Sequence, residues 1–343
     1  AGALEWTIVR PGVFPFGPRD LTSFVHLAAA IERGRMGLVA GGRARITTAY
    51  AENLAEGLAL ALLHPRAAGE IFVIGAFVGV EILLMLEASG GLAAFHPAFV
   101  ILFVLLAGMV ISGLAAMALE RVAYRPLRGA PRLVPLISAI GASFFLQDFI
   151  RLVESLWRNS FYLSYPALPV LDESVKLGLD VEVPVKSVLV IATALVMLLG
   201  LYLFVHRTKV GIAIRAVAQD PDTASLMGIP VNRMIALTFF VGGAMGGAAG
   251  VLFGLHYSLI NPYSGFVPGL KAFTAAVLGG IGNIPGAVLG GIVLGLMEAF
   301  AASYLSLLTN GAFGAEYKDV FAFAILILIL IFRPKGLLGE KVR

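Results

Sequence analysis

The stretch HRTKVGIAIRAVAQDPDTASLMGIPVNR, residues 206–233, separates two long apolar runs, Ser187–Val205 and Met234–Tyr257. Each run is long enough to cross a bilayer as a helix. The stretch contains two acidic residues, Asp220 and Asp222, and four lysines or arginines. The four basic residues are Arg207, Lys209, Arg215 and Arg233. Because basic loops stay on the cytoplasmic side of a membrane, the pattern predicts a membrane protein whose residues 206–233 face the cytoplasm.

A short helix is expected inside this stretch. Pro221 suits a first helical position, Asp222 lies beside it, and Gly228 is typical of a helix end before Pro230. A capped helix held at the membrane surface could be a docking element for a cytoplasmic partner. An ordinary solvated loop fits the same residues, so both interpretations stay open.

The composition excludes several classes of protein. The chain has 343 residues, of which 59% are hydrophobic and 13% charged, with a mean hydropathy of +0.92. These values lie outside the soluble globular range. The absence of cysteine excludes thiolate metal sites and thiol nucleophiles, and His96, His206 and His256 suggest no metal site, so we expect neither metal nor cofactor. The net charge of +4 is too dispersed for a nucleic-acid partner.

Apolar runs continue from about residue 71 to the C-terminus. They predict a mainly α, polytopic helical membrane protein with about eight membrane segments, some of them broken or re-entrant because several runs are short. The runs are Ile71–Leu86, Pro97–Leu119, Leu133–Ile150, Ser187–Val205, Met234–Tyr257, Phe266–Ile281, Pro285–Leu305 and Val320–Phe332.

Basic clusters predict the orientation of these segments. They lie at 121–132, at 206–233 and at 333–343, and all three fall on one side if each run crosses once. The C-terminus and residues 1–70 are then cytoplasmic, and 151–186 form a long outer loop.

Glycines recur every fourth residue in one run, at Gly242, Gly246, Gly250 and Gly254. This spacing gives a ridge on which helices pack closely in lipid. The string GGIGNIPG, residues 279–286, should instead interrupt a helix, and such breaks often line transport paths. Close helix packing alone would also explain the glycines of this string. The candidate residues for the path are Gly279, Gly280, Gly282, Asn283, Pro285 and, further along, Glu298.

Four acids lie in or beside the apolar runs: Glu81, Glu87, Asp148 and Glu298. A charge within a membrane needs a partner, a wet cavity or a function. Glu87 and Asp148 lie near the ends of runs and can reach the interface. We expect the partner of Glu81 to be lost with a missing upstream segment. Glu298 is the best candidate for a path residue, although a bond to a neighbouring helix is the simpler explanation.

Residues 1–70 predict a small α/β fragment, with a strand at Leu4–Arg10 and helices at Leu21–Arg33 and Tyr50–His64. The strings TIVRPGVFPFGPRD (7–20), RITTAYAENLAEGLALAL (45–62) and GEIFVI (69–74) resemble the C-terminal part of the extended short-chain dehydrogenase/epimerase family. The family's Gly-rich phosphate loop and its Tyr-x-x-x-Lys pair are missing. We therefore expect a truncated, non-catalytic fragment with no bound cofactor.

The rest of the chain, about 75–339, resembles the permeases of branched-chain amino-acid ABC importers. The strings behind the resemblance are RAVAQDPDTASLMGIPVNR (215–233), ERVAYRPLRG (120–129), AVLGGIGNIPGAVLGGIVLGLMEA (276–299) and YKDVFAFAILILILIFRPKGLLG (317–339). Asp222, Thr223, Ala224 and Gly228, preceded by Asp220, resemble the "EAA…G" loop by which importer permeases grip their ATPase, with Asp-Thr in place of Glu-Ala.

This resemblance implies a multi-pass permease of a bacterial inner membrane, surrounded by lipid. Its partners would be two cytoplasmic ATPase subunits, a second permease and a periplasmic amino-acid-binding protein. No Walker loop is present, so ATP hydrolysis would occur on the partners and the chain is expected not to be an enzyme.

One departure from the permease family concerns its start. The family has at least one further span ahead of the counterpart of Gly75, and the dehydrogenase-like fragment takes that place. We therefore divide the chain into a fragment at 1–70 and a permease domain at 71–343 that lacks the first span, joined within GEIFVIGAF (69–77). Two alternatives stay open: a non-functional chimera of two truncated genes, and an epimerase-type enzyme fused to a membrane domain.

Overall fold

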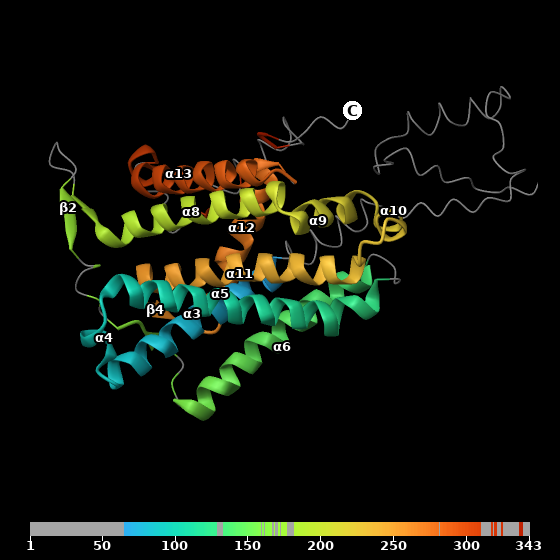
Figure 1. Ribbon diagram of the computed structural model, residues 1–343. Coiled ribbons are helices and arrows are strands. Elements are labelled where there is room, and N and C mark those ends of the chain that lie inside the picture. Colours follow the sequence, from blue (N-terminus) through green and yellow to red (C-terminus); the bar gives the residue numbers. More distant parts are fainter. Residues whose placement is uncertain are drawn as a thin grey trace, which may run out of the picture.

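The computed structural model describes residues 65–128, 133–280 with short gaps between 159 and 181, 282–309, and a few residues between 317 and 338. Figure 1 shows the arrangement of the helices. The strand and helices expected within 1–64 lie outside the described residues, and with them all of the dehydrogenase-like fragment except its last residues, 65–70.

The described part of the chain is mostly helical, and its main helices coincide with the first seven predicted apolar runs. They are α3 (Pro65–Ala88), α5 (Pro97–Leu119), α6 (Leu133–Trp157), α8 (Val185–Arg207), α11 (Val231–Tyr257), α12 (Phe266–Gly279) and α13 (Ile284–Leu308). Within the described ranges, five helices are long and apolar enough to cross a membrane: α3, α5, α8, α11 and α13. The mainly α, multi-pass fold is confirmed. The number of eight segments stays a prediction, since most of Val320–Phe332 is not described.

Helix α3 runs through the join expected at 69–77. Residues 71–74 allowed either a strand or the start of a membrane helix, and they are helical. Both sides of the join belong to one continuous helix, whose described side chains from Gly69 onward are mostly buried or half-buried.

Three helices pack so closely that glycine is required between them. Helix α11 lies against α5 and α3. A Cβ on Gly75 of α3 would come within 2.3 Å of the carbonyl oxygen of Gly247. A Cβ on Gly247 would lie 2.5 Å from the carbonyl oxygen of Gly108 in α5. These contacts form the centre of the fold, where small residues let backbones approach. In Figure 1, α3, α5, α6 and α11 lie on one side of the molecule and α8 and α13 on the other, with α12 between them.

Short strands and turns connect the helices at the end of the molecule opposite α9 and α10 (Figure 1). Strand β1 (Leu163–Ser164) pairs antiparallel with β4 (Leu259–Ile260), and β2 (Ser174–Lys176) with β3 (Glu182–Pro184). A short helix, α4 (Gly91–Ala94), precedes α5. Tyr165 follows β1, and its buried hydroxyl donates to the Ala76 carbonyl of α3 at 2.6 Å. The segment after α6 is thereby fixed to the helical core.

The polar stretch 206–233 folds into two helices, α9 (Lys209–Gln219) and α10 (Pro221–Leu226). The short helix predicted from Pro221 is confirmed. Helix α9 was not predicted. It begins at Thr208, whose side-chain oxygen accepts a hydrogen bond from Gly211 N at 3.0 Å, the usual way in which threonine caps a helix start.

Candidate functional site

The start of α10 is fixed by Asp220. Its Oδ1 accepts hydrogen bonds from the backbone N–H groups of Asp222 and Thr223, both at 3.0 Å, and its Oδ2 accepts one from the Thr223 hydroxyl. These donors favour the charged carboxylate, so they hold the pKa of Asp220 below its usual value, with the Thr223 hydroxyl as the main cause. Asp220, Asp222 and Thr223 therefore form a capped and rigid helix start.

The other end of α10 is exposed and apolar. Leu226 and Met227 are 88% and 79% exposed. Gly228 follows with a φ of 83°, a left-handed conformation that favours glycine, and a Cβ there would meet nothing within 4 Å. The chain thus turns away behind two large apolar side chains that point into open space.

The inner face of α10 rests on a small apolar cluster. Ala224 is buried in a cluster with side chains from four other elements, among them Tyr124, Val217 and Ile235. The Tyr124 ring also packs on Phe239 of α11, with centroids 5.6 Å apart. We call this cluster the α10 seat. Its residues come from the turn after α5, from α6, from α9 and from α11, so α10 is packed against all four.

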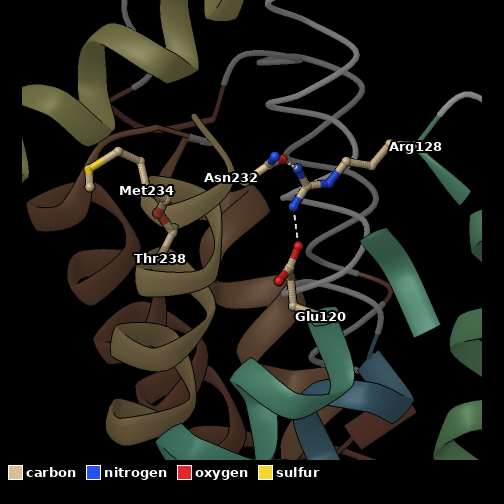
Figure 2. Close-up of polar contacts among 5 residues, drawn as sticks. All are labelled: Glu120, Arg128, Asn232, Met234 and Thr238. Carbon is tan, nitrogen blue, oxygen red and sulfur yellow. Dashed lines mark hydrogen bonds and ion pairs between the residues drawn. The ribbon is translucent and has the colours of Figure 1, made fainter. Parts of the chain in front are cut away.

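Next to the α10 seat lies a polar contact that the sequence analysis missed. Glu120 and Arg128 form an ion pair, and Arg128 Nη1 donates to Asn232 Oδ1 of α11 at 2.6 Å (Figure 2). The sequence did contain a signal, an acid at the end of an apolar run followed eight residues later by an arginine. Nothing in the pattern indicated that Asn232, more than one hundred residues further on, would meet them.

The break 279–286 separates α12 from α13, and in Figure 1 it lies at the end of α13 nearer α9. Gly280 and Gly282 have φ values of 108° and 92°. A Cβ on Gly279 would lie 1.9 Å from the Gly286 carbonyl oxygen, so the two helix ends are in backbone contact. Asn283 Oδ1 accepts from Gly286 N at 3.1 Å and thereby caps α13, and Pro285 lies in its first turn.

A segment near the C-terminus binds the carbonyl groups of two residues at the end of α12. Leu337 N donates to Leu278 O at 2.8 Å, and Leu338 N donates to Gly279 O at 3.0 Å. Asn283 Nδ2 donates in turn to Leu338 O at 3.0 Å. The last carbonyls of α12, which a helix end leaves without an intrahelical partner, are thus bound by the chain itself. Whether the break borders a transport path stays a prediction.

Glu298 lies in an ion-pair cluster. Lys271 Nζ of α12 contacts Glu298 Oε2 of α13 at 2.8 Å and Asp319 Oδ1 at 2.9 Å. Sequence reasoning overlooked Lys271, a single lysine within an apolar run. The structure therefore pairs Glu298 with a neighbouring helix, which is the simpler of the two explanations considered for it.

The other acids divide into exposed and paired ones. The expectation that Glu81 lost its partner is wrong, because Arg158 at the end of α6 holds it with two bonds of 2.5 and 2.9 Å. Glu87 and Asp148 are both exposed. Glu87 lies at the end of α3 as predicted, whereas Asp148 lies within α6, which continues to Trp157. Sequence reasoning missed Glu70 of α3, which is fully buried and accepts a hydrogen bond from Gln147 Nε2 at 2.6 Å.

The glycines of α11 face two neighbours. Gly250 and Gly254 are buried against α3 and Tyr165, where a Cβ would come within 2.0 Å of Phe72 O and 2.2 Å of the Tyr165 ring. Gly246 is only half-buried beside Ile71, and Gly242 is also half-buried. The closest packing against α5 involves the adjacent Gly243 and Gly247, so the ridge is wider than the four-residue spacing indicated.

Comparison with known proteins gives consistent matches. Residues 67–330 match the family model of the branched-chain amino acid transport system permease component. The high-affinity branched-chain amino acid transport system permease protein BraD of Pseudomonas aeruginosa is 44% identical over 277 residues, which are 80% of this chain and 85% of that protein. The corresponding permease LivH of Escherichia coli K12 is 43% identical with the same coverage. The fructose import permease FruG of Bifidobacterium longum is 25% identical over 255 residues, 72% of each chain. No solved structure matches.

Proposed function

Because the chain belongs to the family of branched-chain amino acid transport system permease components, we propose that it forms the membrane path of an ABC importer for branched-chain or related amino acids. A permease subunit moves its substrate and leaves hydrolysis to partners, so the chain is a multi-pass transport protein and not an enzyme. The proposed assembly comprises two cytoplasmic ATPases, a second permease and a periplasmic amino-acid-binding protein, in the inner membrane.

The observation behind the coupling part of this proposal is the geometry of α10. It is a capped helix whose Ala224 is buried in the α10 seat and whose Leu226 and Met227 are exposed. Large apolar side chains that are almost fully exposed at a helix tip are typical of a protein contact site. We propose that they enter the ATPase, that Asp220, Asp222 and Thr223 hold the helix start, and that Gly228 provides the turn behind the tip. This requires α10 and the C-terminus to be cytoplasmic.

The test is co-purification of the ATPases with the tagged chain from its own membrane. Leu226→Ser combined with Met227→Ser should leave the yield of the permease unchanged, because both side chains are exposed. The double variant should lose most of the bound ATPase and of the hydrolysis stimulated by the loaded binding protein. Val122→Ser is the matched control, since Val122 is 77% exposed in the turn after α5 but lies outside α10. Undiminished ATPase binding by the double variant would refute the docking role of Leu226 and Met227.

The substrate class can be tested in the same assembly. In proteoliposomes with ATPases and binding protein, ATP-dependent uptake of leucine, isoleucine or valine should exceed uptake of fructose. Fructose is the informative comparison because a fructose permease is among the more distant relatives. Preferential fructose uptake would contradict the assignment.

We further propose that residues 71–343 are the permease domain and that residues 1–70 have no catalytic role, since the sequence there lacks a phosphate loop and any lysine. Calorimetric titration of the full chain with NAD should show no saturable heat. Micromolar binding would instead favour an enzyme fused to the membrane domain.

A further inference from the structure

Arg128 joins two segments that are far apart in the sequence. One guanidinium nitrogen pairs with Glu120 at the end of α5, and the other donates to Asn232 Oδ1 at the start of α11 (Figure 2). A planar guanidinium can hold two acceptors in fixed directions at once, which a lysine ammonium does less well. Arg128 therefore fixes the distance between the ends of two membrane helices.

The chain between Glu120 and Arg128 is shaped for this contact. Residues Glu120–Tyr124 form a π-helical turn, and Arg125–Leu127 form a 3₁₀ turn. Wide π turns within helices are uncommon and occur frequently at functional sites. Here the two turns bring Arg128 back to the carboxylate at the end of α5. The same π turn ends in Tyr124, a residue of the α10 seat.

The other side of the contact is also rigid. Asn232 lies in the first turn of α11, where the Thr238 hydroxyl donates to the Met234 carbonyl at 2.9 Å (Figure 2). Ile235 and Phe239 of the following turns belong to the α10 seat. Both ends of the Arg128 contact are therefore continuous with residues on which α10 rests.

The two partners of the ion pair differ in burial, because Glu120 is buried and the Arg128 side chain is 26% exposed. Glu120 is 1% exposed, so its carboxylate depends on Arg128 for charge compensation. Removing Arg128 leaves the buried carboxylate of Glu120 without a counter-charge, which costs more than removing both charges. Glu120 and Arg128 should therefore behave as a unit in mutagenesis.

We propose that Arg128 is a positioning residue that ties α5 to α11 beneath α10, so that a movement of α10 displaces both membrane helices together. This proposal rests on the proposed docking of an ATPase to α10. Arg128 acts through Glu120 and Asn232, the two partners of its guanidinium. Its role is to prevent the seat from opening when α10 is pushed or pulled.

The first test uses the chain alone. Ala224→Cys introduces a single thiol into a chain without cysteine, at a position that is 5% exposed. In this background, Arg128→Gln should raise the labelling rate by a water-soluble maleimide at least about tenfold, because it opens the seat. Arg125→Gln, in the exposed part of the same turn, should leave the rate unchanged. Equal rates for Arg128→Gln and the parent would overturn the proposal.

The double variant Glu120→Gln/Arg128→Gln removes both charges and should label more slowly than Arg128→Gln alone. Such non-additivity is the signature of two groups in direct contact. Additive effects of the two substitutions would contradict the proposed unit.

The second test separates positioning from mere folding. In the assembled importer, Arg128→Gln should keep its bound ATPase and its KM for ATP but lose most of the stimulation by loaded binding protein. Wild-type stimulation in this variant would overturn the positioning role. If the wild-type chain itself captures no ATPase, the proposed function fails, and the labelling result still decides whether Arg128 closes the seat.

Discussion

The loop 206–233 and the break 279–286 are both polar or glycine-rich interruptions between apolar helices, yet the structure completes them in opposite ways. In the loop, Asp220 caps α10 locally and the helix tip remains exposed. In the break, the free carbonyls at the end of α12 are bound by Leu337 and Leu338 from the same chain. An interruption whose hydrogen bonds are satisfied locally leaves its surface available to a partner. In the break, these carbonyls are already bound by the chain itself, although Gly282 and Pro285 stay exposed.

Gly279 and Gly228 give the largest expected contrast between the two regions. A Cβ on Gly279 would lie 1.9 Å from backbone, whereas one on Gly228 would meet nothing within 4 Å. Gly279→Val should cost about 3 kcal/mol, the upper end of the overpacking range, because the Cβ meets backbone rather than a flexible side chain. Gly228→Val should cost about 1–2 kcal/mol from the left-handed backbone alone. Unfolding of the two variants in mixed SDS–detergent micelles measures this contrast, and similar costs would mean that the break is not closely packed.

Gly336 tests whether the C-terminal segment is part of the break. It has a φ of 76°, and a Cβ there would lie 2.6 Å from Gly280 N. Gly336→Val should destabilise the chain by about 1–2 kcal/mol, because the segment can detach and so limit the strain. The amides of Leu337 and Leu338 should then exchange hydrogen faster, as measured by mass spectrometry. Gly295→Val in α13, where a Cβ meets nothing, is the control, and unchanged exchange in Gly336→Val would remove the segment from the site.

Asp220 gives the smallest effect, a dependence on pH at the start of α10. Its folded pKa lies below the usual value because the Thr223 hydroxyl and two backbone N–H groups favour the charged form. The resulting stabilisation is therefore complete above the ordinary pKa and is lost as the pH falls through the lower folded value. A spin label at Met227→Cys should become more mobile over that acidic range. Asp220→Asn, which caps without titrating, should show no such change; an equal change in both would locate the titration elsewhere.

Local patterns in the sequence predicted local features well. Proline at a first helical position located the start of α10, and hydropathy located seven apolar runs, because both signals depend only on neighbouring residues. Contacts between distant segments were not predictable in this way. Arg158 lies 77 residues from Glu81, and Leu338 lies 55 residues from Asn283. A single sequence contains no record of which pairs meet, so the α10 seat, Lys271 and the Arg128 contact emerged only from the structure.

The pairing of Lys271 with Glu298 and Asp319 also bears on how the protein enters the membrane. Helix α12 has 14 residues, fewer than the roughly 20 needed to cross a bilayer, and a lysine near the middle of a membrane helix costs about 2.5–3.5 kcal/mol on insertion scales. Its first acidic partner, Glu298, is synthesised 27 residues later. We therefore expect α12 to wait at the translocon until α13 emerges, so that the two enter the lipid as a neutral hairpin, with Asp319 joining them last.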